Sequence, residues 1–242
     1  MGYDSDSEKL ATLIAQAQLQ PRKKNWGNPA PLALAGLVLT LTPLSCQLMG
    51  WRGSDPNGFA NNGAHFFCGG LLLFLGGLLE FFLAHTFGFV VYCAYGGFFL
   101  ALGATLTPGF GAETPYMKSG VLGAEFYASF GFFYLFVGLL SFVFLICSLR
   151  TNLCLVILFL AYTIAFPLLA AAEWAHAEGR MALSHRLTTG GGAACFVVSM
   201  CSWWAMLGGL LQSVDWPFDL PMGDLSHIIP AGRREVDVEK LE

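Results

Sequence analysis

The sequence predicts an all-α membrane protein with six transmembrane helices. Of its 242 residues, 55% are hydrophobic and only 12% are charged, whereas soluble domains usually carry about 25% charged residues. A helix needs about 20 apolar residues to cross a bilayer, and six runs approach or exceed that length. They cover residues 31–50, 63–83, 86–107, 121–147, 153–172 and 189–213. A water-soluble class is therefore excluded.

The distribution of lysine and arginine predicts the orientation of these spans. With six spans the two termini share a side, and that side holds eight of the twelve basic residues: Lys9, Arg22, Lys23, Lys24, Arg150, Arg233, Arg234 and Lys240. The other side holds Arg52, Lys118, Arg180 and Arg186. Because positive charge concentrates in cytoplasmic loops, we expect both termini in the cytoplasm.

The apolar spans and the polar segments at either end divide the chain into three parts. We expect a mobile cytoplasmic N-terminal tail over 1–27, a pore domain over 28–213 and a cytoplasmic C-terminal tail over 214–242. Within the pore domain, Ala84 and His85 alone join two spans, which predicts a tight hairpin. Residues 108–120 are expected to form a loop, and the polar stretch 173–188 a short interfacial helix.

Glycines recur every seven residues within three spans, as Gly69-Gly70 with Gly76-Gly77, Gly96-Gly97 with Gly103, and Gly131 with Gly138. Seven residues make about two helical turns, so each set forms a stripe. Stripes of small residues let helix backbones approach closely inside a membrane.

The first span begins with a capped helix start, Asn28-Pro29-Ala30-Pro31-Leu32. Asparagine caps helices, and proline fits the first turn because it lacks an amide hydrogen. The remaining amides carry a partial positive charge that attracts carboxylates. This turn is either an anion-binding helix end or a plain cap at the membrane entrance.

Glu80 and Glu125 lie in apolar spans, where a charge is costly and tends to face protein or water. Each is either a proton-coupling carboxylate or an interfacial residue. Thr40 and Thr86 offer hydroxyls to a carboxylate, or bond to their own helix backbone. His65 and His85 are candidate pH sensors or solvated histidines at loop edges.

The sequence predicts no enzyme, cofactor, metal or nucleic-acid partner. The spacing of His176, His185, Glu173 and Glu178 matches no strong ligand pattern, and the seven cysteines lie almost entirely in apolar runs, where they act as small hydrophobic residues.

Several segments in order resemble the acetate transporter family of fungi, archaea and bacteria, also called the Gpr1/Fun34/YaaH family. They are residues 28–34, the Phe67-Cys68-Gly69-Gly70 and Gly77-to-Phe81 motifs, Thr86-Phe87-Gly88, Tyr95-Gly96-Gly97-Phe98, and residues 220–224, which resemble the ending of fungal members. The chain departs from the family pattern at Ala33, where glycine is usual, at Leu73, where bacterial members often have glutamine, and at His85, where asparagine is common.

The resemblance implies a six-helix protomer with its own pore, assembled as a homo-hexamer. It also implies that Leu37, Tyr95 and Tyr162 form an apolar constriction, which would gate by excluding water. The alternative for each of these residues is ordinary core packing.

Three functions stay open on the sequence. The first is a plasma-membrane channel or proton-coupled permease for acetate and related small monocarboxylates. The second is an ammonium exporter of the same architecture. The third is a membrane sensor that does not transport.

Overall fold

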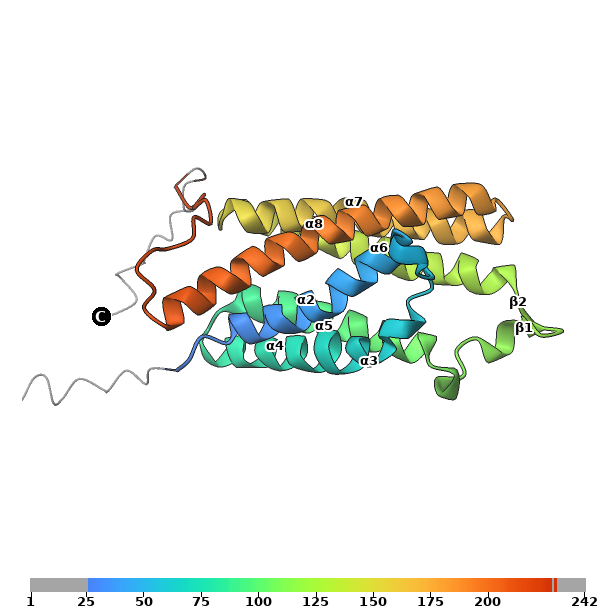
Figure 1. The fold of residues 1–242 in the computed structure, drawn as a ribbon, viewed down its shortest axis with the longest axis horizontal. Helices are drawn as coiled ribbons and strands as arrows, with labels where there is room; N and C mark the ends of the chain where they lie inside the picture. The colour runs from blue at the N-terminus through green and yellow to red at the C-terminus, as the bar shows by residue number, and fades with distance from the viewer. Residues whose placement is uncertain (1–25, 228, 230–242) are drawn as a thin grey trace, which may run out of the picture.

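The computed structural model describes residues 26–227 and 229, and these residues hold six helices long and apolar enough to cross a membrane. The helices lie side by side along the long axis of the molecule (Figure 1). Five of them are single α-helices: α2 (Ala30–Leu48), α5 (Thr86–Leu106), α6 (Ala124–Ser148), α7 (Leu153–Ala177) and α8 (Met181–Ser213). The other span joins η2 (Phe59–Asn61), α3 (Asn62–Ala64), the π-helix η3 (His65–Leu72) and α4 (Leu73–Phe82). The predicted fold class is confirmed.

The described chain begins and ends at the same end of this bundle (Figure 1), which we call the terminal end. The α4–α5 hairpin lies there too, and its tight turn is confirmed, since only Leu83, Ala84 and His85 separate the helices and Ala84 has a φ of 59°. The opposite end, called the loop end, carries the longer connections. The cytoplasmic placement of the termini stays a prediction, and most of the predicted tail over 1–27 lies outside the described residues.

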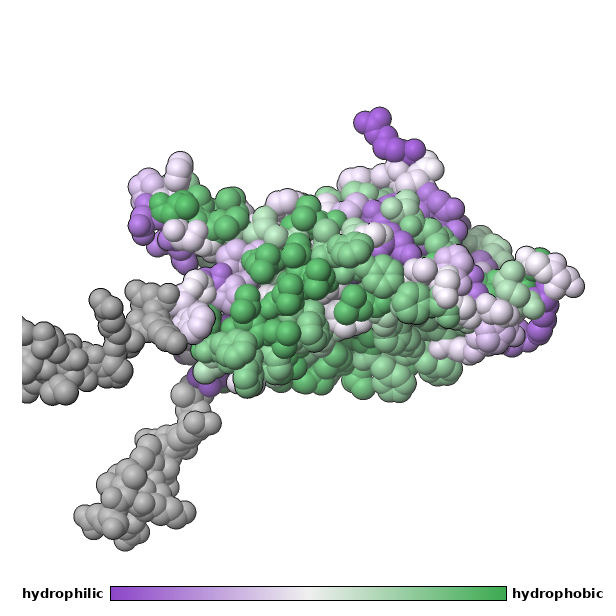
Figure 2. Space-filling view, turned by 90° about the horizontal axis from the view of Figure 1, so that it is seen from below, coloured by the Kyte–Doolittle hydropathy of each residue, from purple (hydrophilic) through white to green (hydrophobic). Residues whose placement is uncertain are grey.

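Apolar side chains cover the flanks of the bundle. Figure 2 shows a broad hydrophobic surface between two more polar ends. Large residues contribute to the exposed surface on every span, including Leu75 and Phe82 on α4, Phe136 on α6 and Ile164 on α7. Such a surface suits contact with lipid rather than water.

The polar stretch at 173–188 differs from its prediction. It does not form a separate interfacial helix: α7 continues to Ala177, a short turn follows, and α8 begins at Met181. The helices extend beyond the apolar runs because good helix formers such as alanine and glutamate dominate this stretch.

The connection at 108–120 also carries more structure than the predicted loop. It contains η4 (Pro108–Phe110), η5 (Thr114–Tyr116) and β1 (Met117–Lys118), which pairs antiparallel with β2 (Val121–Leu122). The fourth span therefore starts at Ala124 rather than Val121. A further short element, η1 (Trp51–Gly53), follows α2.

Glycine brings α2 close to the second span. A Cβ added to Gly36 would lie 2.5 Å from the carbonyl oxygen of Cys68, and one added to Gly76 would lie 2.7 Å from the Cβ of Ala33. These separations are too short for any side chain, so the backbones touch as the glycine stripes predict. Gly97 is an exception among the stripe residues, because nothing lies within 4 Å of its added Cβ.

The π-helix η3 was not predicted. It widens the backbone ladder within the second span, and the hydroxyl of Thr40 on α2 donates a 2.9 Å hydrogen bond to the carbonyl of Ala64, just before η3 begins. Thr40 thus fastens α2 to this turn. Single π turns inside helices are often found beside functional sites.

Candidate functional site: an aromatic constriction below a cavity

The α5 helix meets α6 and α7 mainly through aromatic side chains, whereas it packs closely against α4 and η3. Phe98 on α5 contacts Phe133 and Tyr134 of α6, and Phe87 contacts Phe144 of α6. Aromatic rings therefore fill the space between α5 on one side and α6 and α7 on the other. We call this interface the seam.

Two other helices turn regular faces toward the same seam. On α2, Leu37, Leu41, Leu44 and Leu48 recur at helical spacing and are all buried. On α7, the matching face carries Tyr162, Phe166 and Leu169. Spacings of three and four residues place such side chains on one stripe of a helix.

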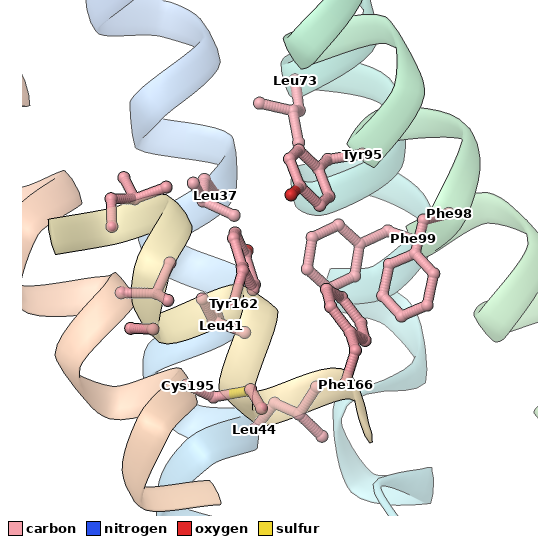
Figure 3. Close-up of a cluster of buried hydrophobic side chains, with 14 of the residues drawn as sticks. Leu37, Leu41, Leu44, Leu73, Tyr95, Phe98, Phe99, Tyr162, Phe166 and Cys195 are labelled. Carbon is pink, nitrogen blue, oxygen red and sulfur yellow. The ribbon is translucent and has the colours of Figure 1, made fainter. Parts of the chain in front are cut away.

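Tyr95 and Tyr162 lie at the centre of the seam (Figure 3), and their rings stack with centroids 4.7 Å apart and an interplanar angle of 20°. Phe166 stacks in turn on Tyr162 at 5.2 Å. Leu37 lies beside Tyr162 from the α2 side. The structure thus brings together the three residues that the resemblance placed in a constriction. We call Leu37, Tyr95 and Tyr162 the tyrosine constriction.

A cavity of about 440 Å³ extends from the loop end down to this constriction. Its floor includes Tyr162, Phe98, Phe99 and Phe166, while Leu37 and Tyr95 lie outside its lining. The walls are mostly aromatic and aliphatic. Pockets with an apolar lining and a few polar groups are typical of small-molecule sites.

The charged groups of this cavity are acidic. Glu113 and Glu173 line it, together with His176 and His185, and within the described ranges no lysine or arginine does. Wherever these carboxyl groups are ionised, they repel a carboxylate anion on its way to the constriction. An uncharged acid or a cation would not be repelled.

Sequence reasoning missed Glu173 and Glu113 as residues of this site. A signal for Glu173 was present, because it follows Tyr162, Phe166 and Leu169 at the same helical spacing. The expectation of a separate interfacial helix hid that pattern. Glu113 gave no signal, since it lies in a loop whose path only the folded chain defines.

The turn Asn28-Pro29-Ala30-Pro31-Leu32 lies at the terminal end, away from the cavity. The side-chain oxygen of Asn28 accepts the amide hydrogen of Ala30 at 3.0 Å, and the carbonyl of Pro29 accepts those of Leu32 and Ala33. Each amide hydrogen of this first turn already has an acceptor. An anion here would be attracted by the helix dipole rather than by free donors.

The two candidate threonines do not reach the cavity either. Thr40 is fully buried against the second span, through its bond to Ala64, rather than bonded to its own helix. Thr86 is exposed at the start of α5, at the terminal end.

The two candidate coupling carboxylates have different surroundings, and neither lines the cavity. Glu80 is only 3% exposed, and its carboxylate accepts a 2.6 Å hydrogen bond from Nδ1 of His85. Glu125 is exposed at the start of α6 and pairs with Lys118.

The two candidate histidines also differ. His85 is exposed, as predicted for a loop edge. His65 is instead fully buried in η3, with its ring stacked on Phe99 at 5.9 Å. The expectation of a solvated His65 is wrong because the second span starts earlier than the apolar run suggests, at Phe59, and encloses the histidine.

Comparisons with known proteins fix the family. The GPR1/FUN34/yaaH family matches residues 11–227, so the chain belongs to this family. The chain is 42% identical to protein alcS of Aspergillus fumigatus over 210 residues, covering 84% of this chain and 77% of that one.

Two further relatives carry transport names. Acetate permease A of Emericella nidulans is 31% identical, with 87% of this chain and 70% of the permease covered. Ammonia transport outward protein 2 of Saccharomyces cerevisiae is also 31% identical, with 82% and 68% covered.

The fold matches that of the bacterial acetate channel SatP with a TM-score of 0.65 and 25% sequence identity, covering 82% of this chain and all of that one. The chain is thus a multi-pass membrane protein of a transporter family.

Proposed function

We propose that this protein is a plasma-membrane channel or proton-coupled permease for acetate and related small monocarboxylic acids. The observation that carries the proposal is the cavity that ends on the tyrosine constriction, within a fold like that of an acetate channel. A constriction lined by stacked rings and leucine admits a small, weakly hydrated molecule more readily than an ion with its water shell.

The charge of the cavity supports the proton-coupled form of this proposal. Two carboxyl groups line it, and among the described residues no lysine or arginine does, so acetate is expected to pass as the uncharged acid or together with a proton. Coupling to a proton also removes the membrane-potential barrier against an entering anion, about 2.3 kcal/mol per 100 mV.

The test is uptake of labelled acetate into liposomes that contain the purified chain. An inward proton gradient, acid outside, is expected to increase the initial rate at least severalfold over liposomes at equal pH. The gradient should be dissipated with a protonophore as a control, and protein-free liposomes should be subtracted because acetic acid crosses lipid unaided. An equal protein-dependent rate with and without the gradient would contradict coupling.

A second candidate function, ammonium transport, is favoured by the same cavity. Aromatic rings and carboxylates together suit a small cation, and one relative is named for outward ammonia transport. Ammonium flux that saturates, with no protein-dependent acetate uptake, would move the assignment to this function.

We also propose that each protomer carries its own pore within a homo-hexamer, and that the Asn28–Leu32 turn marks the mouth of that pore at the terminal end. The seam and cavity lie within one chain, which supports a pore per protomer. Native mass spectrometry of the detergent-solubilised protein would give the number of copies.

A further inference from the structure

The two stacked tyrosines of the constriction differ in what their hydroxyls bind. The Tyr95 hydroxyl lies 2.8 Å from Oγ of Ser141, and Ser141 donates its own hydrogen to the carbonyl of Val137. The Tyr95 hydroxyl is therefore the donor to Ser141. The Tyr162 hydroxyl is also buried, but no described residue forms a hydrogen bond with it.

A buried hydroxyl without a partner destabilises a folded protein, because it has lost its bonds to water. Phenylalanine at position 162 would provide the same stacked ring without that cost. The neighbours of Tyr162 use only its ring: Tyr95 and Phe166 both stack against it. Packing alone thus gives no reason for tyrosine rather than phenylalanine here.

The place of Tyr162 gives such a reason. It is 1% exposed, and it lines the floor of the cavity where the cavity meets the constriction. Phe98, Phe99 and Phe166 line the same floor and offer no hydrogen-bonding group (Figure 3). A molecule that descends through the cavity meets the Tyr162 ring before it reaches Tyr95 and Leu37.

We propose that the Tyr162 hydroxyl is the hydrogen-bond partner of the carboxyl group as the acid passes the constriction. This inference rests on the proposed function. A phenol both donates and accepts, so it pairs with the carbonyl oxygen and with the O–H of an uncharged acid. Tyr95 already donates its hydrogen to Ser141, so it cannot donate to the acid without breaking that bond. Tyr162 therefore sets the affinity for the carboxyl group, while Tyr95 holds the stack in place.

The experiment compares Tyr162→Phe with the unchanged protein in liposomes, by acetate uptake at a fixed proton gradient. The half-saturating acetate concentration is expected to rise about tenfold, which corresponds to about 1.4 kcal/mol at 25 °C. The half-saturating concentration of propionate is expected to rise by the same factor, since both acids present the same carboxyl group. Thr189→Val, on α8 and bonded only to its own helix carbonyl at His185, serves as the control for reconstitution and should match the unchanged protein.

Thermal unfolding in detergent provides a readout that a merely structural role would not give. Tyr162→Phe is expected to keep or raise Tm, because an unpaired hydroxyl is lost. Tyr95→Phe is expected to lower Tm, because a paired one is lost.

Two results would overturn the inference while leaving the proposed function intact. One is an unchanged half-saturating concentration in Tyr162→Phe. The other is a fall in Tm as large as that of Tyr95→Phe, which would mean that the hydroxyl is bonded inside the protein. Absence of acetate uptake by the unchanged protein would instead refute the proposed function, and this inference with it.

Discussion

At the scale of single residues, the folded chain gives a buried charged group near the terminal end a specific partner. This group is Glu80, whose carboxylate is almost fully enclosed and bonded to His85, which is itself exposed. The hairpin fixes this geometry, because the two residues are only five positions apart in the chain and the backbone amide of His85 also bonds to the carbonyl of Glu80 at 3.1 Å. His85 stands where the family commonly has asparagine, and both side chains offer an N–H donor.

Replacing His85 with alanine is expected to lower the stability of the fold by about 1–2 kcal/mol, because the buried carboxylate loses a hydrogen bond to a charged group. The exposure of His85 keeps the effect at this modest level. Thermal unfolding in detergent would measure it. The double variant Glu80→Gln with His85→Ala should recover part of the loss, since a neutral amide is easier to bury than a charge. Equal Tm values for His85→Ala and the unchanged protein would show that solvent replaces the histidine fully.

At the scale of elements, backbone contact on one side of the bundle contrasts with ring contact on the other. Glycine stripes draw α2, η3, α4 and α5 together, so that Gly96 lies against the backbone of Phe74. Across the seam, aromatic side chains separate α5 from α6 and α7. Close packing makes one side a rigid wall, and the aromatic seam leaves room for the cavity.

Gly76→Ala tests the rigid wall. The added methyl group would overlap the backbone and Cβ of Ala33, so α2 and α4 must separate, at an expected cost of about 1–3 kcal/mol. Gly97→Ala is the matched control, because its added Cβ meets nothing within 4 Å and alanine favours a helix over glycine. We expect a lower Tm for Gly76→Ala and an unchanged or higher one for Gly97→Ala. Similar behaviour of the two variants would contradict the close approach.

At the scale of the whole molecule, the segment after α8 ties the terminal end together. It returns to the start of α7, where the carbonyls of Met222 and Gly223 accept the amide hydrogens of Cys154 and Leu153. These are first-turn amides that lack partners inside the helix. Asn152 caps a third, that of Leu155, at 2.9 Å. The family resemblance of residues 220–224 thus coincides with a structural clasp.

Gly223→Ala is expected to loosen this clasp. Gly223 has a φ of 69°, and its added Cβ would lie 2.8 Å from that of Leu153. Gly120→Ala controls for the cost of placing alanine in a left-handed backbone conformation, since Gly120 has a φ of 83° and its added Cβ meets nothing within 4 Å. The left-handed conformation costs either alanine about 1–2 kcal/mol, so a larger fall in Tm for Gly223→Ala would measure the clasp. A fall no larger than that of Gly120→Ala would show that the segment gives way freely.

Much of the fold was predictable because membrane helices are set by local composition. The lengths of the apolar runs predicted six spans, and the two-residue link predicted the hairpin at Ala84 and His85. The ends of α7 and α8 were not predictable in this way, because a helix continues into water wherever its residues favour it. The π turn at His65–Leu72 was missed for a different reason: it lies at a contact between helices, beside the bond from Thr40 of α2 to the carbonyl of Ala64.

The candidate site was likewise predictable only in part. Residue type and spacing along the chain predicted the membrane class, the glycine stripes and, through the motifs, the family. The role of Leu37, Tyr95 and Tyr162 as a pore constriction stays a prediction. That Glu173 and Glu113 share a cavity became visible only in the folded chain. The tertiary structure also decided that Tyr95 has a hydroxyl partner and Tyr162 has none among the described residues. These hydrogen-bond partners and cavity walls come from different helices, so their pairing exists only once the helices are packed.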